Sequence, residues 1–210
     1  FQNLKRVIAA VGGKGRRLNV IMPFLYESRQ HKRSSRESLD CALALQELVR
    51  MGVENIITFD AHDPRVQNAI PLSGFETVSP TYQFVKGLLR TVKDLQIDSD
   101  HMMAISPDEG ATNRAIYLAN VLGLDMGMFY KRRDYTKIVD GRNPIVAHEF
   151  LGSSVEGKDV IIIDDMISSG DSILDVATEL KRRKAKRIYA AATFGLFTNG
   201  MEKFDKAYED

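Results

Sequence analysis

The chain has 210 residues and a formal net charge of +1, from 29 Lys and Arg residues against 28 Asp and Glu residues. This balance argues against binding of nucleic acid through overall charge, and the single cysteine, Cys41, excludes an intrachain disulfide and argues against a cysteine-based zinc site. The apolar runs are far shorter than the roughly 20 residues of a membrane-spanning helix, and no signal-peptide pattern is present. The composition therefore predicts a cytoplasmic protein of one large domain or two small ones, with neither a nucleic acid nor a membrane as its partner.

Strand-like apolar runs alternate with helical patterns along the whole chain. The first helical spacing, over Leu4–Val11, has no capping residue before it and residue 1 is Phe, so we expect the chain to begin inside a structural unit. Short apolar strands that alternate with helices are typical of a parallel sheet, and the sequence therefore predicts an α/β fold. The strand-like runs are Leu18–Leu25, Asn55–Phe59, His101–Ser106, Asp125–Tyr130, Asp159–Ile163 and Arg187–Thr193. The further helical patterns are near Ser35–Met51, Pro80–Asp94, Gly110–Gly123 and Ser172–Arg183.

Two other features bear on the organisation of the chain. The segment Arg132–Gly157 has mixed polarity and several glycines, which predicts a long loop or lid. The strand-like runs Ile56–Asp60 and Ile161–Asp164 both end in Asp, which suggests two similar halves, although chance explains this similarity equally well.

Polar side chains follow five of the predicted strands. Ligands bind at the carboxyl ends of the strands in parallel α/β sheets, so polar clusters at several strand ends favour an active site. The clusters are Glu27–Arg33, Asp60–Asp63, Pro107–Gly110, Lys131–Asp134 and Asp164–Ser172.

The stretch Val160–Ser172 carries the clearest chemistry. An apolar strand ends in Asp164 and Asp165, and a loop with hydroxyls and a glycine then leads into a helix near Ser172. The N-terminus of a helix attracts phosphate, and Gly170 allows close approach of the backbone. Because adjacent carboxylates suit vicinal hydroxyls, we interpret the stretch as a sugar-phosphate site. The alternative is a capped turn, with Ser172 as the helix cap and both carboxylates in solvent.

This stretch resembles the phosphoribosyl-pyrophosphate (PRPP) binding motif of the type I phosphoribosyltransferase superfamily. The motif alone does not separate the transferases from the ribose-phosphate pyrophosphokinases, which make PRPP. The segments that are similar to the pyrophosphokinases occur in the same order over nearly the whole chain. They are Pro23–Lys32, Asp60–His62, Ser106–Gly110 with Arg114, Lys131–Arg133 and Tyr189–Gly195.

The resemblance implies transfer of a diphosphoryl group from Mg-ATP to the 1-hydroxyl of ribose 5-phosphate. It also implies a phosphoribosyltransferase-like fold with two similar α/β subdomains, and a homo-oligomer, usually a hexamer. We expect an N-terminal subdomain over residues 1–124 on the ATP side, and a C-terminal subdomain over residues 125–210 with the flexible loop and the PRPP-binding loop. Both are expected to be incomplete, because the family has further segments before Phe1 and after Asp210.

The resemblance also assigns roles to single residues. Arg29, Gln30 and His62 would bind ATP, and His62 and Asp108 would hold the Mg²⁺ cofactor at its phosphates. Lys131 and Arg133 would be catalytic, with Lys131 as the principal residue. The residues that would bind ribose 5-phosphate are Arg133, Asp164, Asp165, Ser168, Ser169, Gly170, Asp171 and Ser172.

Each of these clusters also has a purely structural interpretation. The basic residues near Arg29 form a solvated turn in that reading, and Lys131–Arg133 form a solvated charge run. His62 caps a helix that starts near Pro64, and Asp108 caps the helix that follows it. Cys41 is expected to pack in the core.

Departures from the family pattern keep other functions open. Residues 65–70 and 168–171 differ from the usual sequence, which suggests a divergent member. The alternatives are a non-catalytic regulatory subunit and a phosphoribosyltransferase that consumes PRPP. The segments around Arg29 and Lys131 argue against the second alternative, because a PRPP consumer has no ATP to bind.

Overall fold

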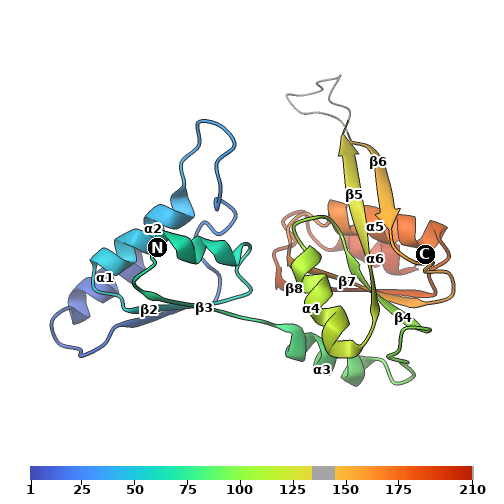
Figure 1. The fold of residues 1–210 in the computed structure, drawn as a ribbon, viewed down its shortest axis with the longest axis horizontal. Coiled ribbons are helices and arrows are strands. Elements are labelled where there is room, and N and C mark those ends of the chain that lie inside the picture. Colours follow the sequence, from blue (N-terminus) through green and yellow to red (C-terminus); the bar gives the residue numbers. More distant parts are fainter. Residues whose placement is uncertain (134–144, 210) are drawn as a thin grey trace. The chain divides into compact units, whose positions relative to one another are not determined.

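The chain folds into two compact units, Phe1–Tyr82 and Gln83–Asp210 (Figure 1). A computed structural model describes the backbone of residues 1–133 and 145–209, and the side chains of these residues except 131–133, 145–148 and 209. Helix α3, Thr81–Thr91, begins at the boundary between the two units.

The first unit is built on a three-stranded parallel sheet in the order β1-β2-β3. In chain order the elements are α1 (Gln2–Val11), β1 (Asn19–Met22), α2 (Asp40–Arg50), β2 (Asn55–Phe59), the 3-10 helix η1 (Pro64–Ala69) and β3 (Gly74–Val78).

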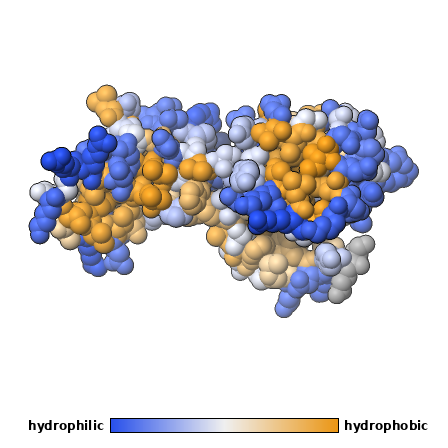
Figure 2. Space-filling model, turned by 90° about the horizontal axis from the view of Figure 1, so that it is seen from below, coloured by the Kyte–Doolittle hydropathy of each residue, from blue (hydrophilic) through white to orange (hydrophobic). Residues whose placement is uncertain are grey.

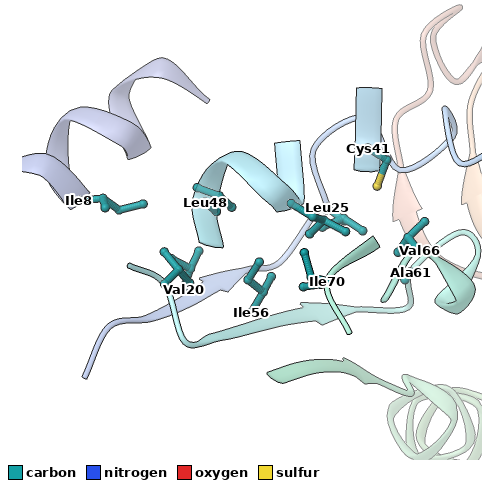
Figure 3. Close-up of a cluster of buried hydrophobic side chains, with 11 residues drawn as sticks. Ile8, Val20, Leu25, Cys41, Leu48, Ile56, Ala61, Val66 and Ile70 are labelled. Carbon is teal, nitrogen blue, oxygen red and sulfur yellow. The ribbon is translucent and has the colours of Figure 1, made fainter. Parts of the chain in front are cut away.

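The core of the first unit lies between its helices and one face of its sheet (Figure 3). Ile8 from α1, Leu48 from α2 and Ile56 from β2 are buried in one cluster. Cys41 belongs to the same cluster, and burial raises the pKa of its thiol to about 11. The prediction that Cys41 packs in the core is therefore confirmed.

The second unit is built on a five-stranded sheet in the order β6-β5-β4-β7-β8. All neighbouring strands are parallel except β5 and β6, which are antiparallel and extend beyond the rest of the sheet (Figure 1). After α3 its elements are β4 (Met102–Ser106), α4 (Thr112–Leu122), β5 (Asp125–Arg133), β6 (Ile145–Leu151), β7 (Asp159–Ile167), α5 (Asp171–Arg182), β8 (Arg187–Gly195) and α6 (Glu202–Glu209).

Helices cover both faces of this sheet, so the central strands β4 and β7 have continuous apolar runs, Met102–Ile105 and Val160–Ile163. Met103 and Ile162 point to the face that packs against α5 and α6. Met102 and Ile161 point to the opposite face, which packs against α3 and α4. The inner strands β4 and β7 are therefore largely buried, and the polar residues that follow them are placed by the core of the unit.

The predicted α/β class with a parallel sheet is confirmed, and the predicted strands and helices are all present with small shifts of their ends. Strands β3 and β6 and helix α6 were not predicted. The prediction of one long loop over Arg132–Gly157 is wrong for part of that segment, because β5 continues to Arg133 and β6 pairs with it. Strand β6 was not recognised because His148 and Glu149 interrupt its apolar residues, and an outer antiparallel strand does not need a continuous apolar run. The part of the predicted lid at residues 134–144 lies outside the described residues.

The predicted boundary between residues 124 and 125 differs from the division of the structure. Strand β4 pairs with both β5 and β7, so the predicted boundary falls within a single sheet. The units divide instead between Tyr82 and Gln83. The strand pairing that decides this joins segments far apart in sequence, which local patterns do not reveal.

Apolar side chains are also grouped on the surface, with hydrophilic residues around them (Figure 2). Among the described residues, Tyr117 and Val121 of α4 are 53% and 54% exposed, and Ile21 of β1 is 66% exposed. Within the same described part of the chain, no helix is long and apolar enough to cross a membrane.

Candidate active site at the carboxyl ends of the strands

Strand β7 brings two adjacent carboxylates to its carboxyl end. Asp165 is buried, with 2% of its surface exposed, and Asp164 is half-buried. The backbone N–H of Asp165 donates to Oδ1 of Asp164 over 2.8 Å. A backbone hydrogen bond within the pair therefore orients the carboxylate of Asp164.

The surroundings of Asp164 disfavour its charged form. The pKa of this carboxyl is raised to about 7. Burial makes the largest contribution, and the neighbouring charges of Asp165 and then Asp108 contribute less. A buried carboxyl beside other carboxyls is stabilised by donors or cations that approach it from outside. The end of β7 is thus suited to a ligand with hydroxyl groups or to a cation.

Asp108 follows the adjacent strand β4 and closes the turn before α4. Its Oδ1 accepts backbone N–H groups from Gly110 at 2.9 Å and Ala111 at 3.3 Å. The hydroxyl of Ser106 donates to its backbone carbonyl over 2.6 Å. Asp108 thus closes the turn, but the N-cap residue of α4 is Ala111 and no side chain caps this helix, so the structural interpretation of Asp108 as a helix cap is wrong. The charge of Asp108 acts on Asp164, because β4 and β7 are neighbours.

The loop after β7 leads directly into α5. Gly170 is the N-cap residue, with a φ of +87°, and no side chain caps the helix there. The helix begins at Asp171, so the alternative with Ser172 as the cap is not what the structure has. The hydroxyl of Ser169 donates to Oδ2 of Asp171 over 2.9 Å. Because the first N–H groups of a helix have no partner within it, this end of α5 is a natural place for an anion.

Helix α6 covers this loop, which the sequence analysis missed. A Cβ atom on Gly170 would stand 2.3 Å from the ring of Phe204, so Gly170 allows the aromatic ring to pack directly on the loop. The backbone N–H of Thr198 donates to the carbonyl of Ser168 over 3.0 Å. Lys203 forms an ion pair with Asp171 and lowers the pKa of that carboxyl, with a smaller contribution from Ser169. The only sequence signal was the spacing of Met201, Phe204 and Tyr208, which is typical of a short amphipathic helix.

A second polar cluster lies at the carboxyl end of β2 in the first unit. The chain turns at Asp60, which has a φ of +43°. The rings of His31 and His62 lie 5.2 Å apart between centroids, and Nε2 of His31 lies 3.6 Å from Oδ2 of Asp63. Burial lowers the pKa of His31 despite the nearby charge of Asp63. His62 and its predicted partner Asp108 belong to different units.

Asp63 has a cationic partner in its own segment. The guanidinium of Arg65 donates to both carboxylate oxygens of Asp63, at 2.9 Å and 2.6 Å for the two closest contacts. These hydrogen bonds lower the pKa of Asp63 to about 2. The same carboxylate accepts the backbone N–H of Arg65 and so caps η1. The cap is therefore Asp63 and not His62, which corrects the structural interpretation of His62.

Arg29 and Gln30 follow β1 in the first unit. Arg29 is exposed and lines an open hollow of about 510 Å³. Phe1 and Tyr26 stack in the wall of this hollow, with ring centroids 4.5 Å apart. The hollow thus combines aromatic surface with a cation. Its other lining residues are Leu4, Met22, Phe24, Glu27 and Ser28.

Lys131 and Arg133 lie in β5, close to the residues that the structure does not describe. Lys131 pairs with His148 of β6, and Arg133 pairs with Ile145. Their side chains lie outside the described part of the chain. Their catalytic roles therefore stay predictions.

Comparison with known proteins identifies the domain around β7. Residues 82–209 match the family model of the phosphoribosyl transferase domain. The chain belongs to this family. The match begins at the boundary between the two units, so the whole phosphoribosyl transferase domain corresponds to the second unit. The β7 end lies inside this domain and the β2 end lies before it.

Curated relatives cover both units. A protein named ribose-phosphate pyrophosphokinase from Vibrio parahaemolyticus is 31% identical over 87% of this chain and 54% of its own length. A protein of the same name from Ralstonia nicotianae is 29% identical over 88% of this chain and 55% of its own length. The chain thus spans about half the length of these relatives. The resemblance to the phosphoribosyltransferase superfamily and its pyrophosphokinases is confirmed.

A solved structure supports the fold of this phosphoribosyl transferase family member. Phosphoribosylpyrophosphate synthetase from Mycobacterium smegmatis aligns with a TM-score of 0.77 and 24% identity. The alignment covers 93% of this chain and 59% of the other. The likeness therefore extends beyond the phosphoribosyl transferase domain and includes the first unit.

Proposed function

We propose that the chain carries a ribose-phosphate pyrophosphokinase activity. It transfers the diphosphoryl group of Mg-ATP to the 1-hydroxyl of ribose 5-phosphate and gives PRPP and AMP for nucleotide biosynthesis. The observation that carries this proposal is the end of β7, where two adjacent carboxyls, one buried and one half-buried, precede a hydroxyl-rich loop at the start of a helix. Similarity to proteins named ribose-phosphate pyrophosphokinase along most of the chain supports the same reaction.

In this proposal Asp164 and Asp165 bind the ribose. An ionised carboxylate accepts hydrogen bonds only, and the vicinal hydroxyls of ribose are matching donors. The raised pKa of Asp164 supports this role, because hydroxyl donors stabilise the charge that its protein neighbours disfavour.

The loop after β7 binds the 5-phosphate. The start of α5 contributes N–H groups and the positive end of the helix dipole. Gly170 allows the backbone to approach the anion, and no side-chain cap occupies this helix end. The proposed phosphate-binding residues are Ser168, Ser169, Gly170, Asp171 through its backbone N–H, and Ser172.

The first unit binds ATP in this proposal. Arg29 lines a hollow with aromatic walls, which suits a base next to a chain of phosphates. Gln30 and His62 contact the same nucleotide. These assignments follow the family resemblance. The aromatic hollow supports the assignment of Arg29.

Mg²⁺ fits the available ligands as an ion carried by the nucleotide. Among the described residues, no group of three or more His, Cys, Asp or Glu side chains is placed to hold a metal ion. Mg²⁺ is commonly held by one or two protein carboxylates together with substrate phosphates, and Asp108 offers such a carboxylate. The assignment of His62 and Asp108 as ligands of Mg²⁺ follows the family resemblance alone, and the bound ion would neutralise charge on the phosphates.

Lys131 and Arg133 are proposed to stabilise negative charge on the transferring group, and Arg133 also to contact ribose 5-phosphate. Phosphoryl-type transfer depends mainly on positioning and on cations placed against developing charge. The segment of β5 that holds both residues pairs with β6 and is thereby anchored to the sheet.

We also propose a cytoplasmic homo-oligomer, with the hexamer of the family as the expected state. The exposed apolar side chains of Ile116, Tyr117 and Val121 on α4 support an interface between copies. Size-exclusion chromatography with light scattering tests this assignment.

A product assay tests the function directly. The chain is incubated with ATP, ribose 5-phosphate, Mg²⁺ and inorganic phosphate, and AMP and PRPP are measured by mass. Equal amounts of AMP and PRPP are expected, and omission of ribose 5-phosphate should abolish both. Binding of ribose 5-phosphate without AMP formation would favour a regulatory subunit. Release of pyrophosphate from PRPP that depends on a nucleobase would favour a transferase that consumes PRPP.

A further inference from the structure

The loop at the end of β7 has an unusual charge for a phosphate site. The segment Asp164–Ser172 contains three carboxylates, Asp164, Asp165 and Asp171, and no Lys or Arg. The helix dipole of α5 supplies only about half of an elementary charge. Any cationic side chain that contacts a phosphate bound here therefore comes from another part of the chain.

Helix α6 brings such a cation to this loop. The ammonium of Lys203 forms an ion pair with the carboxylate of Asp171, the first residue of α5. The charge of Lys203 therefore lies at the end of α5 where an anion is expected. The side chains of Lys203 and Asp171 are 53% and 54% exposed, so Lys203 is able to exchange one partner for another.

The backbone around Lys203 is held in place by contacts that do not involve the ion pair. The ring of Phe204 packs on Gly170 and meets the ring of Phe197 edge to face, with centroids 5.3 Å apart. The backbone N–H of Leu196 donates to the carbonyl of Ile167 over 2.9 Å. Lys203 is thus held next to the loop by its neighbours, independently of Asp171.

We propose that Lys203 binds the phosphate of the sugar-phosphate ligand, with Asp171 as a built-in competitor for its ammonium. In the free protein Lys203 pairs with Asp171, and on binding it turns to the phosphate. Charge-assisted hydrogen bonds between an ammonium and a phosphate are among the stronger polar contacts in proteins. This inference rests on the proposed function, because it names a further residue for the same ribose 5-phosphate site.

The competing explanation is that the ion pair only holds the loop in shape. The two explanations predict opposite effects of Asp171→Asn. If the pair is structural, Asp171→Asn and Lys203→Met both weaken binding. If Asp171 competes with the ligand, Asp171→Asn frees Lys203, removes a like charge and strengthens binding.

The experiment is a calorimetric titration of ribose 5-phosphate into the chain and its variants. Lys203→Met should weaken binding about tenfold or more, the size expected for one charge-assisted contact. Lys203→Arg should bind within a few-fold of the original chain, and Asp171→Asn should bind more tightly. Lys206→Met is the matched control, because Lys206 is exposed on the same helix, and its affinity should be unchanged.

Three results would overturn the proposal. They are unchanged affinity in Lys203→Met, weaker binding in Asp171→Asn, and equal losses in Lys203→Met and Lys206→Met. If circular dichroism shows that Lys203→Met does not fold, the affinities of Lys203→Arg and Asp171→Asn for ribose 5-phosphate still decide between the two explanations. Failure of the original chain to bind ribose 5-phosphate would instead overturn the proposed function, and the Lys203 proposal with it.

Discussion

The carboxyl ends of β7 and β2 place acidic residues in opposite electrostatic situations. At the end of β7, burial and the charges of Asp165 and Asp108 raise the pKa of Asp164 to about 7. At the end of β2, hydrogen bonds from Arg65 lower the pKa of Asp63 to about 2. Each strand runs parallel to its neighbour in its own sheet, and each leads into a polar loop. Position in the fold alone therefore does not explain the difference between the two pKa shifts.

The difference lies in where each carboxylate finds its partner. Asp63 is neutralised by a residue two positions along the chain, and this acid is satisfied before any ligand binds. Asp164 faces other acids, and a cation or hydroxyl that stabilises its charge must come from outside the strand. A raised carboxyl pKa at a strand end therefore indicates a ligand site more strongly than the mere presence of an acid there.

The largest expected effect is on binding at the β7 end. Asp164→Ala should weaken the binding of ribose 5-phosphate about 100-fold, because the loss removes hydrogen bonds to a charged acceptor. Calorimetric titration measures the change. Asp175→Ala is the control, since Asp175 is exposed on α5 and lies away from the loop. Equal binding by the Asp164 variant and the original chain would remove the distinction between the two strand ends.

The second effect is on the pH dependence of stability. Because the pKa of Asp164 is raised in the folded state, the folded protein binds more protons than the unfolded chain between about pH 4 and 7, so Asp164 lowers stability as pH rises through this window. Asp164→Asn should not show this loss of stability. Relative to the original chain, its free energy of unfolding should rise by on the order of a few kcal/mol between pH 4 and pH 8. Urea unfolding at the two pH values measures it. A variant whose advantage does not grow with pH would contradict the raised pKa.

The sequence predicted those features of the two strand ends that depend on residues close together along the chain. It did not predict those that depend on contacts between distant residues. The adjacent acids and the loop that follows them were read from Val160–Ser172, because the motif is contiguous. The raised pKa of Asp164 was not predicted, since it depends mainly on burial in the folded chain and to a smaller extent on the charges of Asp165 and Asp108. The contact of Lys203 with Asp171 joins residues that are 32 positions apart, and no local pattern reveals it. Nor did the sequence analysis expect that Arg65 neutralises Asp63.

A third effect tests the packing of the loop under α6. Gly170→Ala should cost about 1–3 kcal/mol of stability, because φ is positive there and the new Cβ would meet the ring of Phe204. Thermal unfolding measures the loss, and Phe204→Ala in the same chain should recover part of it. Gly87→Ala in α3 is the matched control. Its new Cβ meets nothing within 4 Å, and it should stabilise the helix slightly. Equal effects at both glycines would argue against a tightly packed loop.

The smallest effect belongs to the β2 end. Arg65→Ala should change stability only slightly, because Arg65 is largely exposed and solvent screens the pair. It should also return the pKa of Asp63 toward its ordinary range, so the contribution of the pair is present at neutral pH and lost as pH falls from about 4 to 2. Binding of ribose 5-phosphate should not change. A large loss of that binding would mean that the β2 end takes part in the sugar-phosphate site.

The most direct test follows backbone amide signals by nuclear magnetic resonance while ribose 5-phosphate is added to the chain. The account predicts saturable shifts concentrated at residues 164–172 and at Lys203, with little change at residues 60–65. Shifts centred on residues 60–65, or no saturable shifts at residues 164–172, would contradict the claim that the end of β7 is the sugar-phosphate site.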